Sequence, residues 1–81
     1  MIEYFRVDPG YSAIVEQEVK RILQENGREL SFGVLEKRLN PHPLIKIVES
    51  IPNDDPKVID FNKKHLGFEV YKIVNGKLLQ S

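Results

Sequence analysis

The hydrophobic pattern divides the first third of the chain into an extended segment and an amphipathic helix. Residues 1–7, "MIEYFRV", alternate between two sides, which is typical of a strand or an N-terminal arm. Over residues 9–26 the apolar side chains recur at helical spacing, and Asp8 followed by Pro9 is a good helix start. We expect Gly27 to end this helix, because glycine adopts the left-handed conformation at low cost.

The pattern predicts two more helices in the middle of the chain. Ser31 is a suitable N-cap for a helix over residues 31–39, and the leucines on either side of the cap can form a hydrophobic staple. Pro43 then starts a helix over residues 43–51, "PLIKIVESI", in which apolar residues share one stripe. The polar side of this third helix collects His42, Lys46, Glu49, Ser50 and Asn53.

Residues 57–66 fit two structures. As a helix, the segment starts at Pro56 with Asp54 or Asp55 as the cap, buries Val58, Ile59 and Leu66, and ends at Gly67. As a strand, "KVIDF" alternates and leads through the turn "NKKHLG" into the next strand. The pattern leaves both open. Residues 68–80 are clearer, because two β-type runs flank Asn75-Gly76, a strong hairpin signal.

These elements predict one small α+β domain over residues 1–81: an N-terminal edge strand, three helices, or four if 57–66 is helical, and a C-terminal β-hairpin. A chain of this length buries only a little over half of its unfolded surface, so its stability should be low and a partner or a dimer is plausible.

The order and spacing of "VEQEVKRILQENGRELSFGVLEKRLN" and "HPLIKIVESI" resemble the three helices of the winged-helix variant of helix-turn-helix proteins. The resemblance implies duplex DNA binding, with the third helix in the major groove and the hairpin as a wing, and transcription regulation as the commonest use. The third helix of that family is usually polar and basic, whereas "PLIKIVESI" is largely apolar and offers only Lys46.

Composition limits the chemistry. The absence of cysteine excludes disulfides, thiolate zinc sites and thiol nucleophiles, and suits a reducing compartment, so we expect a cytoplasmic protein. No apolar run approaches the roughly 18 residues of a membrane span, and the N-terminus does not resemble a signal peptide. The possible metal ligands, His42, His65, Asp54 and Asp55, match no metal template, so we predict no metal, no cofactor and no enzyme.

The 12 basic and 12 acidic residues balance, so DNA binding would have to depend on local clusters. The candidate nucleic-acid contacts are His42, Lys46 and Ser50 on the third helix, Lys63, Lys64 and His65 at the wing tip, and Lys37 and Arg38 on the second helix. If residues 57–66 are helical, the last three cations of that segment have a structural explanation instead, since they favour the helix dipole.

A protein-interaction module on the same scaffold is the alternative function, and a homodimer through the N-terminal strand or the first helix is a further expectation. A continuous positive surface joining Lys37, Arg38, Lys46, Lys63 and Lys64 would favour DNA, whereas an exposed patch of Ile45, Ile47 and Tyr71 would favour a protein partner. The aromatic residues Tyr4, Phe5, Phe68 and Tyr71 either line such an interface or fill the small core.

Overall fold

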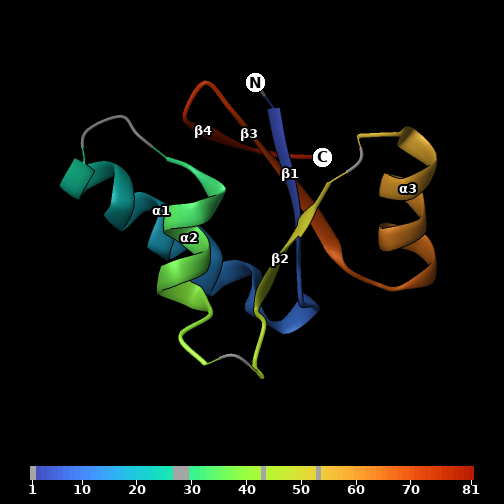
Figure 1. Cartoon of the computed structure of the whole chain (residues 1–81), viewed down its shortest axis with the longest axis horizontal. Coiled ribbons are helices and arrows are strands. Elements are labelled where there is room, and N and C mark those ends of the chain that lie inside the picture. The colour runs from blue at the N-terminus through green and yellow to red at the C-terminus, as the bar shows by residue number, and fades with distance from the viewer. Residues whose placement is uncertain (1, 27–29, 43, 53) are drawn as a thin grey trace.

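The computed structural model describes residues 2–26, 30–42, 44–52 and 54–81, and it shows an antiparallel sheet between two helical layers (Figure 1). The strands are β1 (Ile2–Val7), β2 (Val48–Ile51), β3 (Glu69–Val74) and β4 (Lys77–Gln80). The helices are α1 (Ser12–Asn26), α2 (Phe32–Leu39) and α3 (Pro56–Asp60), with a 3-10 turn η1 (Pro9–Tyr11) before α1 and a π-helical turn η2 (Phe61–His65) after α3.

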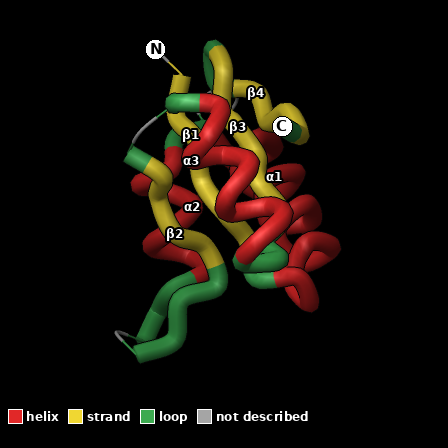
Figure 2. The backbone as a smooth tube through the Cα atoms, turned by 90° about the vertical axis from the view of Figure 1, so that its right-hand side faces the viewer, coloured by secondary structure: helices red, strands yellow, loops and turns green. Residues whose placement is uncertain are grey.

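The sheet has the order β2-β1-β3-β4, so the N-terminal strand lies inside it. Helices α1 and α2 cover one face, and α3 lies on the other, in front of β1 and β3 when the molecule is seen from that side (Figure 2). Side chains alternate along a strand, so Phe5 and Val7 of β1 belong to the core under α1 and α2, while Tyr4 packs under α3. Both faces of the sheet are therefore buried.

The larger core lies between the sheet and the pair α1 and α2. Phe5 is fully buried, and its ring centre lies 5.5 Å from that of Phe32 and 5.8 Å from that of Tyr71. Burial of a large apolar side chain stabilises a fold by about 1.5–3 kcal/mol. The buried members of this core are Phe5, Val7, Val15, Val19, Ile22, Leu30, Phe32, Leu35, Leu39, Val48, Tyr71 and Ile73.

Short-range signals in the sequence set several element ends as expected. The Ser31 hydroxyl accepts a hydrogen bond from the Val34 N–H (3.3 Å) and caps α2. Gly67 has a φ of +73° and ends the helical segment before β3. Asn75 and Gly76 have φ values of +52° and +75°, which the two-residue turn between β3 and β4 requires. The predicted hairpin and the first two helices are confirmed, although α1 begins only at Ser12, after the 3-10 turn Pro9–Tyr11, and α2 begins at Phe32.

Two predictions were wrong, and one ambiguity is resolved. Residues 43–51 do not form a helix in the described part, because 44–47 are a loop and Val48–Ile51 pairs with β1 as strand β2. The N-terminal strand is not an edge, because β1 also pairs with β3. Residues 57–66 are helical rather than a strand with a wing tip. The predicted positions Gly27, Pro43 and Asn53 lie outside the described residues.

Two physical reasons explain why residues 44–51 do not form the predicted helix. This segment is rich in β-branched residues, which favour extended structure. In addition, the Asn40 side chain binds the backbone of Ile47 and Val48 just after α2, which holds the chain extended beside β1. The winged-helix resemblance assigns its third helix to this segment, and there the described residues form a loop and a strand.

Candidate interaction surface on α3 and η2

Helix α3 continues directly into the π-helical turn η2, and the wide turn decides which side chains face the sheet. The Leu66 N–H donates to the Phe61 carbonyl oxygen (3.2 Å), five residues earlier, which is the hydrogen bond of a π-helix. Such turns are rare and occur often at functional sites. Here the turn brings the polar residue Asn62 to a buried position, only 5% exposed, and leaves Phe61 on the outside.

Asn62 anchors this segment to the rest of the protein. Its side-chain amide donates to the Val58 carbonyl (2.9 Å) and accepts from the Arg6 guanidinium (2.9 Å). Its backbone carbonyl accepts from the Phe68 N–H (3.0 Å). Buried amides are costly unless they are hydrogen-bonded, and within the described residues every buried side-chain polar atom has a partner. Each buried polar atom of the Asn62 side chain therefore has a hydrogen-bond partner.

Arg6 extends the anchor across the sheet. Its second terminal nitrogen donates to Glu49 of β2 (2.6 Å), and its guanidinium lies 4.3 Å from the centre of the Phe68 ring. A planar guanidinium suits both contacts at once, because it offers donors in its plane and a cationic face to the ring. One side chain of β1 therefore joins β2, η2 and the segment before β3.

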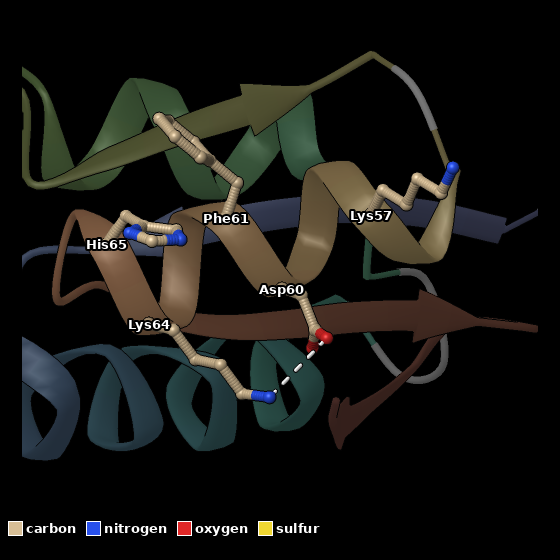
Figure 3. Close-up of a pocket in the computed structure, with 5 residues that line it drawn as sticks. All are labelled: Lys57, Asp60, Phe61, Lys64 and His65. Atoms are coloured by element: carbon tan, nitrogen blue, oxygen red, sulfur yellow. Dashed lines mark ion pairs between the residues drawn. The ribbon is translucent and has the colours of Figure 1, made fainter.

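The outer side of α3 and η2 carries an open hollow of about 250 Å³ (Figure 3). Phe61 and His65 lie next to each other on one side of the hollow, with ring centres 5.1 Å apart. Phe61 is 51% exposed. Asp60 and Lys64 point to the other side and form an exposed ion pair of 3.6 Å. The lining residues are Lys57, Asp60, Phe61, Lys64 and His65, and we call this set the α3 surface.

The predicted wing-tip cations lie on this helical layer. Lys64 and His65 line the hollow, whereas Lys63 turns away and donates to the Ser81 carbonyl (3.0 Å). Lys37 and Arg38 lie on α2, on the opposite face of the sheet. The two groups of cations therefore do not form one surface.

Arg38 is already engaged by carboxylates. Its guanidinium binds Glu18 of α1 (2.9 Å) and also Glu25, and these hydrogen bonds raise the pKa of Arg38. The interaction joins α1 to α2 and explains the residue structurally. A guanidinium held between two carboxylates is a poor phosphate clamp.

The predicted third-helix contacts are dispersed in the same way. His42 and Lys46 are exposed in the loop between α2 and β2, and Ser50 is exposed on the edge strand. The His42 Nδ1 accepts from the Leu44 N–H (3.2 Å), a bond within the loop. Since residues 44–51 contain no helix, these side chains do not share a helical face.

Ile45, Ile47 and Tyr71, whose exposure together would favour a protein partner, do not form one exposed patch, because Tyr71 is in the core. Ile45 is 57% exposed, but Tyr71 is only 3% exposed, and its hydroxyl donates to Glu69 (3.2 Å). Burial raises the pKa of Tyr71. Phe5 and Tyr71 are buried, so the interpretation as core residues is confirmed for these two, while Tyr4 and Phe68 are half-buried.

The sequence interpretation missed three members of the α3 surface, Lys57, Asp60 and Phe61. The helical alternative counted Leu66 among the buried residues, but Leu66 is 46% exposed. A signal was present: at helical spacing, Phe61 shares a side with Lys57 and with Lys64 or His65, away from Ile59. An aromatic residue on the charged side of a helix is a candidate for binding.

Among the described residues, no three His, Asp or Glu side chains come close enough together to hold a metal ion. No helix in this part of the chain has the length and apolar composition needed to cross a membrane. The chain matches no protein-family model, no curated protein and no solved structure. Its function must therefore be inferred from the α3 surface itself.

Proposed function

We propose that this chain is a small protein-interaction module whose α3 surface binds an acidic segment of a partner protein. The observation that carries the proposal is the half-exposed Phe61 ring, whose centre lies 5.1 Å from that of the tilted His65 ring, on a surface that Lys57 and Lys64 also line. An apolar side chain of the partner covers the ring, and carboxylates next to it meet the lysines.

The composition of the surface follows the usual anatomy of an interface. A stiff aromatic residue at the centre supplies contact area at low conformational cost, and a polar rim adjusts orientation and association rate. Lys57 and Lys64 supply two positive charges against the single negative charge of Asp60, so the surface has an excess of positive charge at its rim. This complements an acidic segment rather than a basic one.

Duplex DNA, the other partner that the sequence suggested, has less support. Binding by a recognition helix over 43–51 would need a helix where the described residues form a loop and strand β2. The cations of α2 and of η2 lie on opposite faces of the sheet, so they would contact different molecules. A winged-helix regulator stays a prediction, and it is the second arm of the test.

The test is selection, on the unmodified chain, from a display library of random 12-residue peptides. We expect selected peptides to combine an aromatic or aliphatic residue with flanking Asp or Glu. In fluorescence anisotropy Phe61→Ala should weaken their binding by about tenfold or more, since truncating a central anchor costs at least about 1.4 kcal/mol. Lys57→Gln with Lys64→Gln should weaken it less and reduce its salt dependence.

The matched control is Leu44→Ala, which removes an apolar side chain that is 86% exposed in the loop between α2 and β2. It should leave peptide binding unchanged. Peptides without acidic residues, or equal binding to Phe61→Ala, would refute the proposal. A labelled random DNA duplex is titrated in parallel, with Lys63→Glu/Lys64→Glu as its variant, and salt-sensitive binding that this variant abolishes would establish DNA as the ligand instead.

A further inference from the structure

In the described residues the sheet ends in two outer strands, β2 and β4, and part of the outward backbone of β2 is already hydrogen-bonded. At β2, the Asn40 side chain donates to the Val48 carbonyl (2.6 Å) and accepts from the Val48 N–H (3.2 Å). Pro52 follows the strand and has no N–H to offer. This edge is therefore only partly open to pairing with another strand.

At β4 the outward groups can be identified from the register. Leu79 lies opposite Lys72 and Leu78 opposite Ile73, and the Ser81 N–H donates to the Val70 carbonyl (2.9 Å). Hydrogen-bonded pairs alternate along an antiparallel ladder, so Leu79 directs its backbone groups to β3, as Ser81 does. Leu78 and Gln80 direct theirs away from the sheet, and in the described residues nothing binds them.

We propose that two copies of this chain pair through β4, antiparallel, with a two-fold axis at Leu79. In this register Leu78 of one copy lies opposite Gln80 of the second, and the outward N–H and C=O groups of both residues form hydrogen bonds in each direction. The sheet then continues through the dimer. A two-fold interface must be self-complementary. The outward groups of Leu78 and Gln80 meet this condition, because they lie at equal distances on either side of Leu79.

The side chains fit the same register. Leu79 faces its own counterpart in a pair without backbone hydrogen bonds, where side chains approach most closely, and Leu79 is 47% exposed in one copy. Lys77 lies opposite Ser81 of the second copy, so the two lysines are at opposite ends and like charges do not meet. A register centred on Leu78 would instead use Gly76 of the turn and leave Leu79 opposite Lys77.

Dimerisation through β4 also has a consequence for the α3 surface, and this point rests on the proposed function. A two-fold axis perpendicular to a continuous sheet keeps equivalent faces on the same side. The two α3 surfaces therefore lie on one side of the dimer, where a partner with two acidic segments can bind both and gain avidity. The interface is small, so we expect a weak dimer that depends on protein concentration.

The test is sedimentation equilibrium of the full chain from about 10 μM to about 1 mM, a range that covers weak association. We expect the average mass to rise toward that of a dimer. Gln80→Pro removes one outward N–H and no bond to β3, so it should give a folded monomer throughout the range. Leu79→Lys should do the same, because it brings two positive charges together at the axis.

The control is Ile2→Lys, which places the same charge at a residue that is 50% exposed on β1, away from β4. It should dimerise like the unmodified chain, and circular dichroism checks that all three variants are folded. A wild-type chain that stays monomeric at about 1 mM, or a Gln80→Pro variant that still dimerises, would overturn the proposal. Since no peptide is present, the result is independent of the function of the α3 surface.

Discussion

The two helical layers cover the same sheet with different chemistry. In the described residues, twelve buried apolar side chains join the sheet to α1 and α2, whereas the cluster under α3 has three, Ile51, Ile59 and Val70. The α3 layer depends in addition on the polar contacts of Arg6 and Asn62. One layer is thus held mainly by burial and the other by a few specific hydrogen bonds.

This difference predicts unequal stability. A buried apolar side chain contributes about 1.5–3 kcal/mol, while a typical hydrogen bond contributes about 1 kcal/mol net. The α3 layer should therefore open locally more often than the layer of α1 and α2. The surface that we assign to binding lies on the less stable layer, where adjustment to a partner costs least.

The largest effect should come from Phe5→Ala. Phe5 is fully buried in the central strand and contacts Phe32 and Tyr71, so its loss leaves a cavity and should reduce the free energy of unfolding by about 3–5 kcal/mol. Because β1 supports both layers, urea denaturation should show one cooperative transition at much lower urea. Phe61→Ala, the same change on the exposed side, should cost less than about 1 kcal/mol. Equal losses would mean that Phe61 is a core residue.

Asn62→Ala should have a smaller effect that is confined to one layer. It leaves a donor of Arg6 without its partner and removes one of the hydrogen bonds to the Val58 carbonyl, at a cost of about 1–3 kcal/mol. Amide hydrogen exchange should become faster in residues 56–68 and remain slow in α1 and β1. Lys63→Ala, the adjacent exposed position, is the control and should change little. Uniformly faster exchange would show that the two layers open together.

The parts of the fold that could be predicted from the sequence carry their signals locally. Ser31 marks the start of α2 by its own hydroxyl, and Asn75-Gly76 fixes the hairpin by its own backbone conformation. The amphipathic pattern of 9–26 needs only one apolar neighbour to become a helix. In each case the deciding interaction spans a few residues.

The predictions from the sequence were wrong where contacts with residues far away in the chain determine the local structure. The apolar positions of 43–51 suit a helix, but pairing with β1 and the hydrogen bonds from Asn40 make Val48–Ile51 a strand. The orientation of the "NKKH" side chains depends on the π-helical turn that buries Asn62 against Arg6. That contact joins residues 56 positions apart, which no short-range pattern reports.

The smallest effects should come from the helix caps. Each layer has one, so the same kind of substitution can be compared directly between the two layers. Ser31 accepts from the Val34 N–H at the start of α2, and the Asp55 carboxylate accepts from the Lys57 N–H (2.9 Å) at the start of α3. Replacing either residue by alanine should cost about 1 kcal/mol. Asp55→Asn, which keeps an acceptor oxygen, should lose less than Asp55→Ala.

The readout differs between the two caps even though the cost is similar. Ser31→Ala weakens the layer that holds the main core, so it should lower the urea midpoint of the whole domain. Asp55→Ala weakens the α3 layer, so it should speed hydrogen exchange in residues 56–66 before it changes the midpoint. If both variants shift the midpoint equally and leave local exchange unchanged, the layers form one cooperative unit. The α3 surface would then bind its partner as a rigid surface.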